Sequence, residues 1–313
     1  MKYQNLVCAL LYLAVLLLFA TVPGGAESRQ KVTVSMRPYK GTRAVVAVKL
    51  NGVGPYDFMV DTGATVTVLD AALFHELGLQ ALGSSRIVSS AGTTDQILSA
   101  VKDITLDSVS VRDVAVVSMK SPMNGTDYRA VRGILGENFL RHFDILIDNQ
   151  HRTVTLDAGD GLADSLTGER LPVTFPPLPP GDEHRYQPRI SVTVQTYGAA
   201  SMLLDSGADM LVLLQWGNSR SGGGYEARLR TVNGSLSCES THDKLQLGKG
   251  TVRDLAILRC QTILVKPSDA EGILPTAIFK QIFISHAGSY AIVDPTPRCQ
   301  VELEMAALTP VSQ

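Results

Sequence analysis

Two short segments of the chain place an aspartate, a small hydroxyl residue and a glycine inside an apolar run. The first is Asp61-Thr62-Gly63, within YDFMVDTGATVTVL, and the second is Asp205-Ser206-Gly207, within SMLLDSGADMLVL. An ionised carboxyl is costly to bury without a partner, and glycine weakens a strand. Because both segments break a run that would otherwise suit a buried strand, we expect them to serve chemistry.

The residue types suit hydrolysis if the two segments meet in space. Two carboxyls a few ångströms apart cannot both ionise comfortably, so they share a proton and titrate as a pair. One carboxylate can then act as general base on a water while the other, protonated, donates to a carbonyl. Glycine permits close approach of another backbone, and a hydroxyl can both donate and accept. We therefore predict a catalytic pair, Asp61 and Asp205, and loop-bracing residues Thr62, Gly63, Ser206 and Gly207.

The chain repeats itself in sequence. The two aspartates are 144 positions apart (205 minus 61), the segment VRDVAVV at 111–117 recurs as VRDLAIL at 252–258, and GILGENFL at 133–140 recurs as GILPTAIF at 272–279. Three matches in the same order at nearly constant spacing indicate an internal duplication. The sequence therefore predicts two homologous lobes, each supplying one aspartate.

Short runs of β-branched and apolar residues predict a mainly β architecture. In the first lobe the expected strands are 31–36, 44–50, 104–106, 114–117, 143–147 and 153–156. Helix signals are few: 71–77, with Asp70 as a possible N-cap, and 137–142. The second lobe has no counterpart of the first helix, and 216–225 is expected to form a loop.

The N-terminal segment and a Pro-rich segment in the middle of the chain define the expected domains. Residues 1–26 lack charge after Lys2, are apolar from Leu6 to Val22 and end in small residues, as in a cleaved signal peptide. The alternative is an uncleaved membrane anchor. Either implies export, to the periplasm or the medium, or anchoring to the membrane. We place the lobes at 31–172 and 186–303, joined by a Pro-rich connection at 173–185.

These motifs resemble those of the aspartic proteases, in a bilobal pepsin-like layout. Ala64 and Ala208, which follow the two glycines, make the lobes more similar to the retroviral type, the retropepsins and their bacterial relatives. The resemblance implies two β-barrel-like lobes of the acid-protease fold with an active-site cleft between them, a polypeptide substrate and hydrolysis of peptide bonds. It assigns the dyad to Asp61 and Asp205. It also implies that Ile134-Leu135-Gly136 packs behind the first catalytic loop.

Two features depart from the family pattern. The second copy of the packing element has Pro275 in place of glycine, and proline cannot donate from its backbone. No flap tyrosine of the pepsin type is present. The candidate flap is a turn-rich tip that resembles a retropepsin flap more than a pepsin flap, and it comprises Ser89, Ser90, Ala91, Gly92 and Thr93. A weaker counterpart lies at 231–235 in the second lobe. An alternative function is therefore a non-catalytic peptide-binding or inhibitory protein that retains the fold.

Composition argues against other classes of function. With a formal net charge of -2 there is no basic excess for nucleic acid. The six histidines show no metal-ligand spacing, and no nucleophile elbow or zinc-protease helix occurs, so we expect no metal and no cofactor. We expect a monomer. Outside the first 26 residues the cysteines are Cys238, Cys260 and Cys299; two of them could pair, and the sequence does not decide which.

Overall fold

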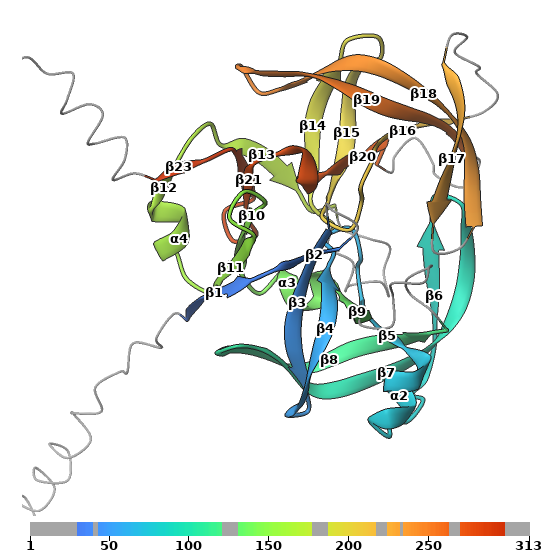
Figure 1. Ribbon diagram of the computed structural model, residues 1–313, viewed down its shortest axis with the longest axis vertical. Coiled ribbons are helices and arrows are strands. Elements are labelled where there is room, and N and C mark those ends of the chain that lie inside the picture. The colour runs from blue at the N-terminus through green and yellow to red at the C-terminus, as the bar shows by residue number, and fades with distance from the viewer. Residues whose placement is uncertain are drawn as a thin grey trace, which may run out of the picture. The chain divides into compact units, whose positions relative to one another are not determined.

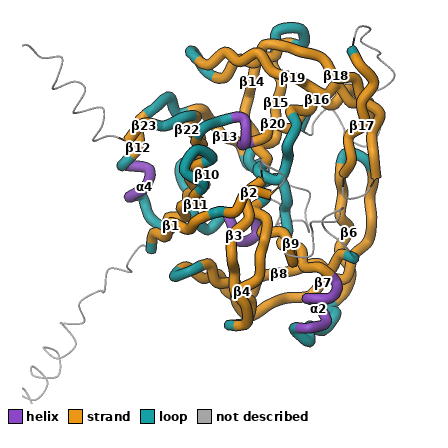
Figure 2. Tube along the Cα trace, in the orientation of Figure 1, coloured by secondary structure: helices purple, strands orange, loops and turns teal. Residues whose placement is uncertain are grey.

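The computed structural model describes residues 30–39, 43–120, 131–176, 187–216, 224–231, 234–262 and 270–297 of the chain. Contacts divide the chain into residues 1–30 and residues 31–313, and every element below belongs to the second unit. Strands dominate it (Figures 1 and 2), which confirms the predicted mainly β class. The predicted signal peptide lies outside the described residues. No helix among the residues that are described is long and apolar enough to cross a membrane.

The first sequence repeat, residues 43–140, lies in an eight-stranded sheet with the order β2-β3-β4-β9-β5-β8-β7-β6. Along its strands, buried side chains either alternate with exposed ones or follow one another directly; in β3 most of the side chains are buried. The strands are β2 (Arg37–Tyr39), β3 (Arg43–Leu50), β4 (Val53–Val60), β5 (Thr67–Asp70), β6 (Gly83–Ser89), β7 (Gly92–Leu106), β8 (Val109–Met119) and β9 (Val131–Leu135).

The second sequence repeat, residues 189–279, has the matching order β14-β15-β20-β16-β19-β18-β17. Both repeats also share one further pairing, β3 with β7 in the first and β14 with β18 in the second. The strands are β14 (Arg189–Val194), β15 (Gly198–Asp205), β16 (Leu211–Trp216), β17 (Tyr225–Thr231), β18 (Gly234–Leu247), β19 (Thr251–Thr262) and β20 (Gly272–Pro275).

The register shows that the repeats agree residue by residue next to the two aspartates. In the first repeat β9 pairs in parallel with β4, where Leu135 lies opposite Val60, and antiparallel with β5. In the second repeat β20 pairs in parallel with β15, where Leu274 lies opposite Leu204, and antiparallel with β16. Each aspartate therefore leaves the same point of the same three-stranded arrangement.

Strands from three separate parts of the chain build the rest of the structure (Figure 1). They continue the sheet of the second repeat in the order β1-β11-β10-β21-β22-β13, and β10 pairs with β21 across 133 to 139 residues of sequence, from Asp148↔Gln281 to Ile145↔Ile284. Their bounds are β1 (Lys31–Ser35), β10 (Asp144–Asp148), β11 (Thr153–Asp157), β13 (Leu171–Thr174), β21 (Gln281–Ser285) and β22 (Tyr290–Val293); β12 (Leu166–Thr167) and β23 (Thr296–Pro297) form a separate pair.

The described helices are short. They are α2 (Ala71–Glu76), α3 (Glu137–Leu140), α4 (Gly161–Asp164) and the 3-10 turn η2 (Thr276–Ile278). As predicted, Asp70 caps α2, because its carboxylate accepts from the Leu73 N–H at 2.6 Å. Helix α3 ends two residues before the predicted limit at 142. Most of the loop predicted at 216–225 lies outside the described residues.

One apolar cluster runs through both repeats and the strands that join them. It includes Leu135 and Phe139 from the first repeat, Leu204 and Leu274 from the second, and Ile284 from β21, all fully or almost fully buried. Since these residues stand directly before or behind the aspartate loops, the loops are anchored in a common core. The limits of the lobes and of the connection stay predictions, and residues 177–185 of that connection lie outside the described residues.

Candidate active site

Reciprocal hydrogen bonds lock the loop of Thr62 to the loop of Ser206. The Thr62 N–H donates to Ser206 Oγ at 3.0 Å, and the Ser206 N–H donates to Thr62 Oγ1 at 3.0 Å. Each hydroxyl then donates to the strand of the opposite repeat, Thr62 to the Leu204 carbonyl at 2.8 Å and Ser206 to the Val60 carbonyl at 2.9 Å. Both side chains are buried. The structure thus brings together the two hydroxyls that the sequence singled out.

The glycines allow the two aspartates to face each other closely. A Cβ atom added to Gly63 would lie 2.5 Å from the carboxyl carbon of Asp205, and one added to Gly207 would lie 2.4 Å from that of Asp61. Real Cβ atoms do not come this close to other carbons. Each carboxyl therefore packs on the glycine of the opposite loop, and only glycine leaves room for it.

Backbone donors orient both carboxyls. Asp61 Oδ1 accepts from the N–H groups of Gly63 and Ala64 at 2.9 and 3.1 Å, and Asp205 Oδ1 accepts from the Gly207 N–H at 2.7 Å. The carboxyls are partly buried and also hydrogen-bond each other. A turn that aims two N–H groups at an acidic oxygen favours its ionised form. Asp205 likewise has a second backbone donor, the Ala208 N–H, which lowers its pKa, so both loops stabilise a negative charge.

The pKa values of the two carboxyls are displaced upward, but unequally. Burial away from water raises the pKa of Asp61, while hydrogen bonds from Asp205, Gly63 and Ala64 and then the charge of Arg43 lower it again. Burial first, and then the charge of Asp61, raise the pKa of Asp205 well above its ordinary value. Since the pair titrates together, the two carboxyls hold one shared proton over a range of pH.

A polar network packs behind the first loop, at the element the sequence analysis placed there. The Asp61 N–H donates to the Leu135 carbonyl at 3.1 Å. The Gly136 N–H donates to Thr67 Oγ1 at 3.2 Å, and a Cβ at Gly136 would lie 2.7 Å from the Val66 backbone. In the second repeat Pro275 lies opposite Asp205 in the parallel ladder. The structure therefore places both copies of the packing element against the aspartate loops.

Two contacts between the repeats were not found from the sequence. Arg43 Nη2 lies 3.1 Å from Asp209 Oδ2, and Gln187 Nε2 donates to the Gly63 carbonyl at 2.6 Å. Arg43 and Gln187 stand 144 positions apart (187 minus 43), the spacing of the aspartates. Each repeat therefore sends one side chain to the loop of the other, and the duplication offset was the signal that could have paired them. Asp209, four residues after Asp205, is thus the ion-pair partner of Arg43.

A buried ion pair lies beside the first packing element. His286 Nε2 is 2.9 Å from Glu137 Oε2, and both side chains are almost completely buried. Burial raises the pKa of Glu137, although His286 opposes the shift. For His286, burial lowers the pKa, but the charge and hydrogen bond of Glu137, followed by the Phe143 carbonyl and Asp144, raise it overall. The pair joins helix α3 to the turn after β21, behind the aspartate loop.

The candidate flap, Ser89 to Thr93, forms the turn between β6 and β7. Ser89 pairs with Gly92 at its end, just as Thr231 pairs with Gly234 at the end of the β17–β18 hairpin. The two tips meet, because Ser89 Oγ lies 3.1 Å from Thr231 Oγ1. Figure 1 shows the two hairpins approaching each other end to end. The predicted counterpart at 231–235 is thus next to the flap itself.

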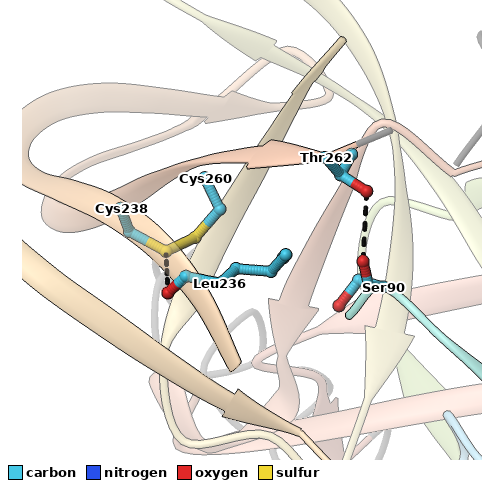
Figure 3. The surroundings of a disulfide bond; sticks show 5 residues. All are labelled: Ser90, Leu236, Cys238, Cys260 and Thr262. Atoms are coloured by element: carbon cyan, nitrogen blue, oxygen red, sulfur yellow. Dashed lines mark hydrogen bonds between the residues drawn. A yellow bond between two sulfur atoms is a disulfide. The ribbon is translucent and has the colours of Figure 1, made fainter. Parts of the chain in front are cut away.

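One cysteine pair is a disulfide. Cys238 and Cys260 lie opposite each other on β18 and β19 and are bonded (Figure 3). The sequence left the pairing open because it depends on the register of two strands; Cys299 lies outside the described residues. Within the described part of the chain, no group of three or more His, Cys, Asp or Glu residues could hold a metal ion.

Part of the chain matches a known protein family. Residues 46–139, which include Asp61 and the candidate flap, match the aspartyl protease family. The predicted resemblance to aspartic proteases is confirmed. No curated protein matches the chain. Among solved structures, a retropepsin-like aspartic protease from Rickettsia conorii is similar at 16% identity with a TM-score of 0.31, and the match covers 42% of this chain and 94% of that one.

Proposed function

We propose that the chain is an aspartic endopeptidase that hydrolyses peptide bonds with a water activated by Asp61 and Asp205. In this proposal Asp61, ionised and held by two backbone N–H groups, takes a proton from the water as its oxygen attacks the peptide carbon. Asp205 gives its proton to the carbonyl oxygen. One carboxylate and one carboxylic acid are needed at the same moment, and a coupled pair that shares one proton supplies them.

The observation that carries the proposal is the reciprocal fit of the two loops. Each aspartate packs on the glycine of the opposite loop, and each hydroxyl bonds the opposite backbone. Two turns with a purely structural role would not require four hydrogen bonds between the repeats, nor would they require two carboxyls that face each other. The match of residues 46–139 to the aspartyl protease family supports the same reaction class.

The direct test is cleavage of a denatured protein across a range of pH. We expect Asp61→Asn and Asp205→Asn each to lower the rate by at least about a hundredfold, the usual contribution of a positioned acid or base. Asp95→Asn serves as control, because that carboxylate is exposed on the flap strand and pairs with Arg86. Circular dichroism checks the fold of each variant. Full activity in either dyad variant would refute the assignment.

The peptide-binding alternative predicts a different outcome of the same experiment. A protein that keeps the fold without turnover would bind a peptide that carries a statin-type transition-state mimic but would cleave nothing at any pH. The features that favoured it were Pro275, the lower helix content of the second lobe and the absence of a pepsin-type flap tyrosine. We give the endopeptidase precedence because both aspartates, both hydroxyls and both glycines occupy matching positions.

We also propose that the protein is exported and that residues 1–26 are a cleaved signal. A disulfide supports export, because disulfides persist mainly in oxidising compartments. N-terminal sequencing of the mature protein distinguishes cleavage after the small residues at 24–26 from a retained anchor. A mature chain that still begins at Met1 would refute the cleaved signal.

A further inference from the structure

The two hairpins that meet at their tips are not tied down equally. We infer that the β6–β7 hairpin is the moving flap, that the β17–β18 hairpin is a fixed support held by the Cys238–Cys260 disulfide, and that Thr262 latches the one to the other. The kinetic consequences of the inference rest on the proposed function, whereas the unequal mobility of the hairpins and the latch do not. It makes Thr262 a positioning residue for the flap.

Polar contacts join the tip of the first hairpin to the second repeat, and two of them carry the inference. One is the hydroxyl contact between Ser89 and Thr231. The other comes from the end of β19, where the Thr262 hydroxyl donates to the Ser90 carbonyl at 3.1 Å (Figure 3). Thr262 is 4% exposed. A buried hydroxyl that bonds the backbone of a turn fixes the turn more firmly than a contact between two partly buried hydroxyls that can turn to water.

The disulfide acts on the same two strands that make these contacts. Cys260 lies two residues before Thr262 on β19, and Cys238 lies four residues after Gly234, where β18 begins. The bond is packed in an apolar cluster with Val212, Leu214 and Leu258. The support is therefore joined covalently to the strand that carries the latch.

The first repeat lacks this tie. Its β7–β8 ladder ends at the pair Ile97 and Ser118, whereas the β18–β19 ladder continues by one more pair, which is the pair of cysteines. The positions in the first repeat that correspond to the cysteines are Gln96 and Met119. Neither can form a covalent bond there. Because opening must break contacts on one side or the other, we expect the movement to fall on the hairpin without the tie.

The test combines amide hydrogen exchange with peptide-cleavage kinetics. Thr262→Val removes the hydroxyl at nearly constant shape. We expect exchange at residues 87–94 to rise about two- to tenfold, the range for one neutral hydrogen bond, with residues 229–236 unchanged. KM should rise by a similar factor while kcat does not fall. Thr262→Ser should restore both values. Thr33→Val, which removes a hydroxyl bonded to Thr155 on β1 and β11, is the matched control.

The role of the disulfide is tested with the double variant Cys238→Ser, Cys260→Ser. We expect exchange to rise in both hairpins, and Thr262→Val to add little when combined with it, because the latch works only on a fixed support. Unchanged exchange at 87–94 in Thr262→Val would overturn the latch. Faster exchange in the second hairpin than in the first of the wild-type protein would overturn the fixed support. Repeating the exchange in Asp61→Asn keeps this test separate from the test of catalysis.

Discussion

Thr62→Val is the most informative single change at the junction of the two repeats. Valine keeps the shape of threonine but lacks the hydroxyl, so packing at this fully buried position is preserved. The change leaves two buried groups without partners, the Ser206 N–H and the Leu204 carbonyl. Each such group costs about 1–3 kcal/mol, so we expect a loss of about 2–6 kcal/mol in the free energy of unfolding.

Two control variants separate this effect from simple loss of packing. Thr62→Ser keeps the hydroxyl and removes one methyl group, which costs about 1 kcal/mol. Thr155→Val removes a hydroxyl bonded only to the Thr33 hydroxyl, whose side chain can turn to water, so its cost should also be small. Urea denaturation followed by far-UV circular dichroism gives the free energies.

The same variant tests whether the junction positions the dyad. Both carboxyls stand next to the hydroxyls that bond across the repeats, so separation of the loops moves Asp61 away from Asp205. A displacement of about 1 Å can lower a rate about a hundredfold, so we expect kcat to fall in the folded fraction of Thr62→Val but not of Thr62→Ser. A valine variant that is as stable and active as the serine variant would refute the reasoning.

Three further predictions address the dyad and its surroundings. Gly63→Ala should abolish cleavage because its methyl would overlap the opposing carboxyl, whereas Gly250→Ala, which has open space around it, should have little effect on rate. Arg43→Gln should shift the acidic limb of the pH–rate profile to higher pH, because the arginine charge lowers the pKa of Asp61; an unshifted limb would contradict this. The midpoint of urea denaturation should fall as pH rises from about 4 to 8. Five groups have a pKa in the folded protein above the ordinary value of 3.8 for Asp, 4.5 for Glu or 6.5 for His: Asp61, Asp144, Asp205, Glu137 and His286. Because the folded protein binds these protons more tightly than the unfolded chain does, the groups stabilise the fold at low pH. This contribution is lost as the pH rises through their folded pKa values. His142, whose burial lowers its pKa, and Glu76, whose pKa is lowered by hydrogen bonds from Tyr56 and Arg132, act in the opposite sense; a midpoint that rises with pH would contradict the prediction.

The sequence predicted the parts of the site that depend on local pattern and on the repeat. Strand β3 begins within one residue of its predicted start, and the Asp70 cap is in place. Strand β7 was largely missed: it spans Gly92–Leu106, but only 104–106 was predicted. Its outer part carries polar and half-exposed residues, because it belongs to a hairpin that extends beyond the core, so hydrophobic pattern gave no signal there.

Contacts between the repeats could not be predicted from the sequence, for a different reason. The ion pair of Arg43 with Asp209 and the contact of Ser89 with Thr231 join residues 166 and 142 positions apart. No local pattern records such a distance, and only the 144-residue offset connects the two halves. The cysteine pairing required the β18–β19 register, which depends on how both strands pack against the second repeat.

Pro275 illustrates how the duplication kept the site while its support diverged. In the first repeat the Gly136 N–H donates to Thr67, and Thr67 donates to the Asn138 side chain, which in turn donates to the Ala115 carbonyl. The register aligns Thr67 with Leu211, Gly136 with Pro275 and Asn138 with Ala277. Proline removes the donor, leucine removes its acceptor, and alanine removes the amide.

Because the Gly136 donor and its Thr67 acceptor both lack a counterpart in the second repeat, that one hydrogen bond is lost without leaving either of its partners unpaired, and such a paired replacement can be nearly neutral. Leu211 and Thr276 remain buried, so packing around the second loop is retained. Pro275 is therefore no sign of a damaged loop. A polar network lies behind the Asp61 loop and apolar side chains lie behind the Asp205 loop, while the charge of Arg43 lowers the pKa of Asp61. An unequal pair is what a shared proton requires, since one carboxyl must keep the proton while the other gives it up.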